Sequence, residues 1–141
     1  MPERLLFDTS AILTLLRDEA GAGKVEELLA RRSGRDRLLL APISLTETYY
    51  IVWQAAGQTA ARETMVRLKT LPLTIVAPTE RIALAAGRLK ALHRLSLADA
   101  VIAATAAEYR ATLVHKDPEY LPLAGQVRLL NLPFKKRGPR R

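Results

Sequence analysis

The sequence contains no cysteine, only two histidines and no long apolar run. Without cysteine, disulfides and cysteine-ligated zinc or iron–sulfur sites are excluded. Because His93 and His115 are too few for a histidine-rich metal centre, any metal would need oxygen ligands. No segment approaches the roughly 20 apolar residues that span a bilayer, and Glu3 and Arg4 do not fit a signal peptide. We therefore expect a cytoplasmic protein with no membrane partner.

The composition is that of an ordinary globular protein, with 49% hydrophobic and 26% charged residues in 141. A chain of this length corresponds to one domain. Such a domain buries roughly 68–70% of its unfolded surface, so a real core is available. We expect a single domain over residues 1–133, followed by a basic tail at residues 134–141.

Positive charge is concentrated in two short segments. The net charge is +8, and residues 135–141 carry five positive charges, which leaves +3 for the rest of the chain. A second basic cluster, RRSGRDR, occupies residues 31–37. Basic tails commonly contact polyanions such as nucleic acid, although a tail of this kind can also serve only to keep a protein in solution.

Two apolar patterns alternate along the chain. Short buried-type runs predict strands at residues 5–7, 38–41, 73–76, 113–114 and 127–130. Helical spacing predicts helices at residues 11–16, 24–32, 44–56, 60–71, 79–92 and 97–110. Because parallel crossovers need helices, this order predicts an α/β fold, with a mostly parallel sheet of four to five strands covered on both faces.

Four acids stand where apolar runs end or new helices begin: Asp8, Glu47, Asp99 and Asp117. In an open parallel sheet, the carboxyl ends of strands and the starts of the following helices share one edge, where ligands bind. The four carboxylates can therefore converge there. Hard divalent cations prefer oxygen ligands of this kind, so the pattern points to a metal site.

Each acid also has a purely local explanation. Asp8 can cap a helix, Ser44 with Glu47 and Ser96 with Asp99 resemble capping boxes, and Asp117 before Pro118 is typical of a turn. A cap needs no partners elsewhere, whereas a metal site needs carboxylates from several segments. Carboxylates crowded within about 4–6 Å repel one another, and a bound Mg²⁺ or Mn²⁺ would remove that cost.

Four segments carry a resemblance to a known family: residues 7–13 (FDTSAIL), 44–47 (SLTE), 95–106 (LSLADAVIAATA) and 113–117 (LVHKD). They resemble a PIN domain, and most of all the VapC-type toxins of toxin–antitoxin pairs. The resemblance extends from Leu5 to about Leu130, and the segment around Asp99 is its most specific part. It implies a three-layer α/β/α fold and a Mg²⁺- or Mn²⁺-dependent endoribonuclease that acts on RNA.

By this resemblance, Asp8, Glu47, Asp99 and Asp117 form the catalytic acidic quartet. The metal would be held by three of them (Asp8, Asp99 and Asp117), with Glu47 as a further ligand or a base that orients water. Thr9 or Ser10 would support the site with a hydroxyl, and Lys116 would hold the RNA backbone. The resemblance also implies a homodimer and a cognate antitoxin protein.

The sequence departs from the family pattern at His115, where a small hydroxyl residue is common. We interpret His115 as an inert residue at a strand end, with crowding of the site or a phosphate contact as alternatives. Glu119 is interpreted as an exposed turn residue, with a role as an auxiliary ligand as the alternative. His93 is interpreted as a surface residue.

The stretch Tyr49-Tyr50-Ile51-Val52-Trp53 places apolar side chains on more than one face of its predicted helix. Core packing explains some of them. A dimer surface or an antitoxin-binding groove could explain the others, because large exposed apolar patches tend to mark partners.

Three other functions are consistent with parts of the pattern. A haloacid-dehalogenase-like phosphohydrolase would need a second acid two residues after Asp8, where Ser10 stands. A receiver-like signalling domain would need paired acids after the first strand and an aspartate after the third. A catalytically inactive PIN-like domain that only binds RNA or protein needs none of these additional acids. His115 keeps this alternative open.

Overall fold

The computed structural model describes residues 3–31 and 37–134, and within them it contains five strands and seven helices. The strands are β1 (Leu5–Phe7), β2 (Leu38–Leu40), β3 (Thr74–Ile75), β4 (Thr112–His115) and β5 (Leu129–Asn131). The helices are α1 (Thr9–Leu16), α2 (Ala22–Leu29), α3 (Pro42–Ala56), α4 (Gln58–Lys69), α5 (Glu80–Leu92), α6 (Leu97–Glu108) and the 3-10 helix η1 (Pro118–Leu123). Each predicted strand and helix is present with slightly different bounds, and η1 was not predicted.

The five strands form one sheet in the order β3-β2-β1-β4-β5, and every pair is parallel. The predicted α/β fold is therefore confirmed. The chain first builds outward from β1 to β2 and β3, and then crosses to the other side of β1 with β4 and β5. The order of strands thus reverses between β1 and β4, and it is outside the carboxyl ends of strands at such a point that ligands bind in α/β sheets.

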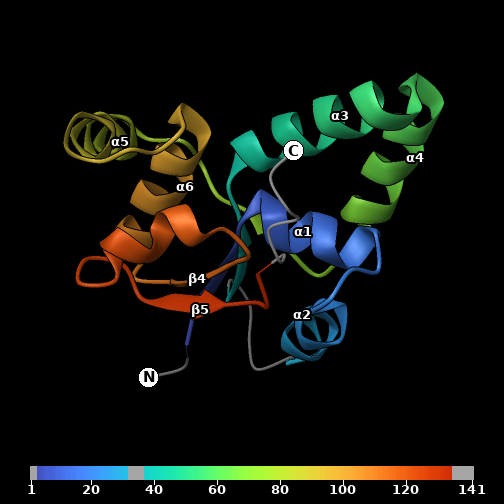
Figure 1. Cartoon of the computed structure of the whole chain (residues 1–141), viewed down its shortest axis with the longest axis horizontal. Coiled ribbons are helices and arrows are strands. Elements are labelled where there is room, and N and C mark those ends of the chain that lie inside the picture. Colours follow the sequence, from blue (N-terminus) through green and yellow to red (C-terminus); the bar gives the residue numbers. More distant parts are fainter. Residues whose placement is uncertain (1–2, 32–36, 135–141) are drawn as a thin grey trace, which may run out of the picture.

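The central strand β1 is buried on both faces, which explains why its sequence is a continuous apolar run. Leu6 belongs to the core that α5 and α6 close, whereas Leu5 and Phe7 belong to the core that α1 and α2 close. Figure 1 shows these helix pairs on opposite sides of the sheet. The alternation follows from the two-residue period of a strand, and it yields the expected three layers.

Helices α3 and α4 form a hairpin that extends away from the sheet, as Figure 1 shows. Gly57 joins them with a φ of 93°, a conformation that favours glycine. Along α3, Ser44 and Thr48 are fully buried, whereas Tyr50 and Trp53 are 45% and 43% exposed. The predicted aromatic stretch therefore contributes only partly to the core.

The capping box expected at Ser44 and Glu47 is wrong. Helix α3 begins two residues earlier, with Ala41 as N-cap and Pro42 in the first turn, and no side chain caps it. Proline suits the first helical position because its φ is already helical and its missing N–H would have no partner there. Ser44 therefore does not cap α3. It lies in the first turn of the helix, and its side chain is buried.

Two predicted basic segments lie largely outside the described residues. Of the tail at residues 134–141, only Phe134 is described, and residues 32–36 of the second cluster are likewise outside. Among the described residues, no helix combines the length and the apolar character needed to cross a membrane.

Candidate active site

The four predicted acids lie at the edge of the sheet where the strands end. Asp8 directly follows β1, and its N–H donates to the Val114 carbonyl of β4 at 2.9 Å. Asp117 lies two residues beyond β4, Glu47 lies in the second turn of α3 after β2, and Asp99 lies in the first turn of α6. The structure therefore gathers acids from four segments at the reversal of strand order, as the strand-end pattern predicted.

The hydroxyl of Tyr120 links two of these acids. It lies 2.7 Å from Asp8 Oδ1 and 2.9 Å from Asp99 Oδ1. Tyr120 belongs to η1, and its side chain is completely buried. A buried tyrosine usually finds a hydrogen-bond partner for its hydroxyl. Here one phenol contacts two carboxyl groups that are 91 positions apart in the sequence, Asp8 and Asp99.

Helix α1 supplies two hydroxyls that hold the acids in place. The Ser10 N–H donates to Asp8 Oδ2 at 3.0 Å, which is the N-cap of α1, and the Ser10 hydroxyl donates to the same oxygen. The Lys116 N–H donates in turn to the Ser10 hydroxyl at 2.9 Å. The Thr9 hydroxyl donates to Glu47 Oε1 at 2.7 Å. Thr9 and Ser10 thereby connect β1, β4 and α3 around the acids.

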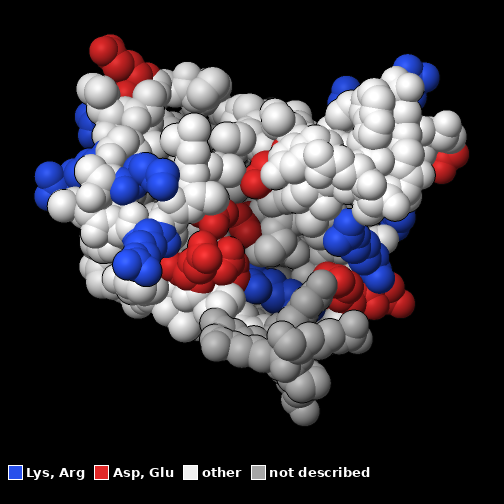
Figure 2. Space-filling view, turned by 45° about the horizontal axis from the view of Figure 1, so that its top comes forward, with Lys and Arg blue, Asp and Glu red and all other residues white. Residues whose placement is uncertain are grey.

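Three carboxylates form the acid cluster, which we define as Asp99, Asp117 and Glu119. One oxygen from each lies within 4.8 Å of the others. Asp117 also caps η1, because its Oδ1 accepts the Glu119 N–H at 2.9 Å. Figure 2 shows acidic side chains gathered beside a hollow on one face, with lysine and arginine side chains around them. Glu119 is thus placed with the acids rather than in an isolated turn.

Burial and mutual repulsion disfavour the charged forms of these acids. Burial, together with the nearby charges of Asp8 and Asp117, raises the pKa of Asp99 to about 7, against the lowering effect of the Tyr120 hydrogen bond. Burial also raises the pKa of Asp8, which is 3% exposed, and that of Glu47. Acids with raised pKa values in one place are a common property of functional sites, because a cation offsets their repulsion.

His115 lies beneath the site as a buried support. Its Nδ1 accepts the Asp117 N–H at 3.0 Å, so this nitrogen carries no proton. The same hydrogen bond fixes the turn that carries Asp117. Burial lowers the pKa of His115, which favours the neutral form. Its ring packs at 5.0 Å from the Tyr120 ring and 6.1 Å from the Phe134 ring. It does not crowd the acids, and its contact with Asp117 is more than the inert role that we expected.

Two features of the site were not found from the sequence. Tyr120 was not singled out, although it follows Asp117 by three residues and a buried tyrosine needs a partner. Lys116, which we expected to hold RNA, donates from Nζ to the Ala20 carbonyl at 2.7 Å, a contact that the sequence did not indicate, and its ammonium keeps further donors. The predicted cap of α6 is present, with Ser96 Oγ accepting the Asp99 N–H at 3.1 Å.

Comparison with known proteins agrees with this geometry. A model of the family described as PIN domain matches residues 5–125. The chain belongs to the PIN domain family. PIN domains are a family of nucleases that typically use divalent metal, and the acid cluster is suited to bind one. No curated protein sequence matches the chain.

Solved structures of VapC toxins share the PIN fold of this chain. VapBC2 from Rickettsia felis, bound to a promoter DNA fragment, matches with a TM-score of 0.74 and 18% identity, over 92% of this chain and 98% of that one. VapC20 from Mycobacterium tuberculosis, a toxin that cleaves the sarcin–ricin loop, has a TM-score of 0.69 and 20% identity, with 87% and 96% covered. FitAcB from Neisseria gonorrhoeae has a TM-score of 0.67 and 21% identity, over 90% of this chain and 96% of that one.

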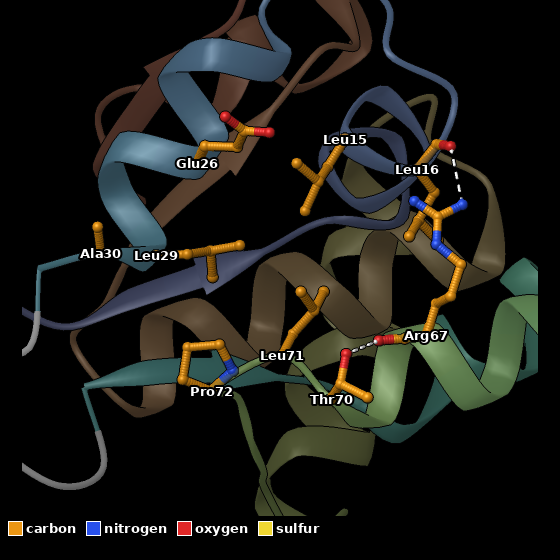
Figure 3. A pocket seen from close by; sticks show the side chains of 9 residues that line it. All are labelled: Leu15, Leu16, Glu26, Leu29, Ala30, Arg67, Thr70, Leu71 and Pro72. Carbon is orange, nitrogen blue, oxygen red and sulfur yellow. Dashed lines mark hydrogen bonds between the residues drawn. The ribbon is translucent and has the colours of Figure 1, made fainter.

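A separate apolar groove of about 600 Å³ lies between α1, α2 and α4. It is lined by Leu15, Leu16, Glu26, Leu29, Ala30, Arg67, Thr70, Leu71 and Pro72. Figure 3 shows the leucines turned toward one another, with Glu26 and Arg67 near opposite ends. Arg67 Nη1 donates to the Leu16 carbonyl at 3.4 Å. The groove contains none of the predicted site residues.

Proposed function

We propose that this PIN domain is a Mg²⁺- or Mn²⁺-dependent endoribonuclease of the VapC type, which acts in the cytoplasm and is controlled by an antitoxin. One observation carries the proposal: carboxyl groups from four separate segments meet where the strand order reverses, and Tyr120 links two of them. Structural roles alone do not require buried acids to face one another, because their repulsion weakens the fold.

The residues present fit a hard divalent cation. Asp99, Asp117 and Glu119 offer oxygens within 4.8 Å of one another, and Asp8 reaches Asp99 through the Tyr120 hydroxyl. Oxygen-only ligands suit Mg²⁺ and Mn²⁺. We assign Asp8, Asp99 and Asp117 as metal ligands, as the family resemblance implied, and we add Glu119. When bound, the ion would lower the pKa of a water molecule and neutralise charge on the phosphate.

The chain's own groups complete the proposed reaction, in which water attacks the phosphorus and the 3′ oxygen leaves and takes up a proton from solvent. Glu47 orients that water and accepts its proton, because its raised pKa makes it a better base than an exposed glutamate. Thr9 fixes the Glu47 carboxylate by its 2.7 Å hydrogen bond. The products would carry 5′-phosphate and 3′-hydroxyl ends.

The deciding experiment is a cleavage assay with end-labelled RNA in Mg²⁺, in Mn²⁺ and in EDTA, with Asp8→Asn as the matched variant. We expect cleavage with either metal, none in EDTA and none with the variant. RNA that shifts in mobility but stays intact would indicate a binding domain instead of an enzyme. Turnover of a generic phosphate ester with RNA left intact would favour a phosphohydrolase.

The apolar groove is our proposed docking site for the antitoxin. Several structural neighbours were crystallised as complexes, including the VapBC and FitAB pairs, and their partners are antitoxins. A groove of leucines with Glu26 near one end and Arg67 near the other suits an amphipathic helix with charges of opposite sign at matching ends. Leu16→Asp should abolish binding of the cognate antitoxin while RNA cleavage continues.

We also propose a homodimer, with the exposed aromatic face of α3 as one part of the interface. Tyr50 and Trp53 are nearly half exposed there, and Tyr49 packs edge-on against Trp53 at 5.5 Å. Exposed aromatic clusters of this kind are typical of protein contacts. Sedimentation of the wild type and of Trp53→Ser tests the assignment, because a monomeric wild type would contradict it.

A further inference from the structure

A hollow of about 280 Å³ opens beside the candidate active site, and we call it the side pocket. Its lining consists of Ser10, Leu13, Arg17, Glu19, Lys116, Asp117, Pro118 and Phe134. Ser10 and Asp117 belong also to the candidate active site, so the side pocket borders that site. The volume is just below the roughly 300 Å³ at which pockets for drug-sized molecules begin, which suits a small flat group.

Phe134 gives the side pocket an exposed aromatic ring. It is 37% exposed, and it packs on the buried His115 ring at a tilt of 36°. Leu13 and Pro118 add apolar surface to the same lining. A half-exposed phenylalanine beside carboxylates serves no obvious purpose in the core. Aromatic rings in such places offer a surface on which a nucleobase can stack.

The segment before Phe134 is firmly held, although it follows the last strand. The Leu132 N–H donates to the His115 carbonyl at 2.8 Å, and the Leu132 side chain is 1% exposed. Pro133 approaches Gly21 so closely that a Cβ there would lie 3.1 Å from Pro133 Cδ. Gly21 also has a φ of +104°, which side-chain-bearing residues rarely adopt. A ring fixed before binding loses little conformational freedom when a ligand arrives.

Two cations lie in the lining beside the ring. Lys116 donates one hydrogen bond to Ala20, which leaves two of the three ammonium protons for another acceptor. Arg17 is exposed at the C-cap of α1. An apolar ring beside two cations matches the base and the phosphate of a nucleotide.

We propose that the side pocket binds one nucleotide of single-stranded RNA next to the scissile bond. The base stacks on Phe134, and its phosphate lies against Lys116 and Arg17. This subsite rests on the proposed function, because it defines how the substrate enters the same site. Since every base has a flat face, stacking fixes the position of the strand without strong selection for sequence.

The test uses the full chain in EDTA, so that RNA stays intact and binding is measured apart from cleavage. Short single-stranded RNAs carry 2-aminopurine at one position each, because this base loses fluorescence when it stacks on an aromatic ring. We expect one position to be quenched by the wild type, with the signal regained in Phe134→Ala and quenched again in Phe134→Tyr. Leu84→Ala, which removes an apolar side chain that is 70% exposed on α5, is the matched control.

Affinity and kinetics give a second readout. Phe134→Ala should weaken RNA binding roughly 5- to 150-fold, the range for loss of one base–aromatic stack. In Mg²⁺, its KM should rise by a similar factor while kcat changes less than about threefold. Arg17→Gln should weaken RNA binding too. Raised salt should reduce the difference in RNA affinity between this variant and the wild type. Circular dichroism of each variant checks that it is folded.

The outcomes separate the subsite from the proposed function. If RNA is cleaved but Phe134→Ala behaves like Leu84→Ala in both readouts, the subsite is wrong and the nuclease proposal stands. If RNA binds and stacks at Phe134 but is never cleaved with any metal, the subsite stands and the nuclease proposal is wrong. If Phe134→Ala proves unfolded, Arg17→Gln and the quenching position of the wild type decide the question.

Discussion

The two ends of helix α1 serve two regions that are built in different ways. At its start, Asp8 and Ser10 belong to a dense polar network, in which a change at one group disturbs its partners. At its end, Leu15 and Leu16 line an apolar groove with few hydrogen bonds. The polar network specifies atoms and distances, whereas the groove specifies only shape and apolar surface. We therefore expect chemistry and partner binding to respond to separate substitutions.

The largest expected effect is the loss of cleavage at the polar end of this comparison. Asp99→Asn should reduce the initial rate of RNA cleavage at least about 100-fold, the size of effect seen when one charge-stabilising group is removed from an active site. Leu16→Ser in the groove should leave the rate within about twofold of wild type. Rates of end-labelled RNA cleavage measure both. Equal losses in the two variants would mean that the regions are not separable.

Metal binding should stabilise the whole fold, and it should do so through the polar region. With Mn²⁺ at about 100 times its dissociation constant, linkage adds about 2.7 kcal/mol, which corresponds to a rise in Tm of roughly 5–10 °C. Asp99→Asn should lose most of this rise, and Leu16→Ser should keep it. Differential scanning fluorimetry with and without EDTA measures the shift. A wild type whose Tm does not change with Mn²⁺ or Mg²⁺ contradicts the proposed metal site.

Removal of the Tyr120 hydroxyl should have a smaller effect on stability. Tyr120→Phe leaves the buried Asp8 oxygen without its 2.7 Å partner, and an unsatisfied buried group costs about 1–3 kcal/mol. Urea unfolding in EDTA should show this loss. The control is Tyr50→Phe on α3, where the ring is 45% exposed and a change within about 0.5 kcal/mol is expected. Equal effects at the two tyrosines would show that the bridge is not a stabilising contact.

The smallest expected effect is a pH dependence of the metal-free protein. The pKa of Asp99 is raised from 3.8 to about 7 in the fold, so the folded state binds a proton more readily than the unfolded state does. Between these values stability therefore increases as the pH falls, and above pH 7 the cost of the charge is complete. Partial exposure limits the effect to about 1 kcal/mol.

Comparison with Asp99→Asn isolates this contribution. The lowered pKa of His115 acts in the opposite direction, because stability that depends on a neutral histidine is lost as the pH falls. Asp8 acts in the same direction as Asp99. Urea unfolding in EDTA from pH 5.5 to 8 should show that wild type loses more stability toward pH 8 than Asp99→Asn does. Parallel pH curves for the two proteins would count against a charged, crowded Asp99.

Much of the fold and the position of the acids could be predicted from the sequence. Short apolar runs separated by helical patterns specify a parallel sheet, and the carboxyl ends of such strands share an edge. Asp8 and Asp117 are predictable for that reason, because each closely follows a buried run. The strand order was not predictable, since pairing of β1 with β4 joins segments about 100 residues apart in the chain and leaves no local mark.

The contacts that hold the site together could not be predicted for the same reason. The bond from Thr9 to Glu47 and the bridge from Tyr120 to Asp8 depend on packing between distant elements. The local capping rule gave a wrong helix start at Ser44. A capping-box pattern is present there, but the helix begins earlier, at Pro42. Sequence patterns indicate which residues share an edge, and the tertiary packing decides which of them touch.

The late position of β4 in the chain has a consequence for protein synthesis. Asp117 and Tyr120 lie in the last quarter of the sequence, after Asp8, Glu47 and Asp99 have already been made. A nascent polypeptide that has left the ribosome only as far as α6 carries three of the acids but neither β4 nor Tyr120, whose hydroxyl links Asp8 to Asp99. The site therefore cannot be assembled until translation is nearly finished.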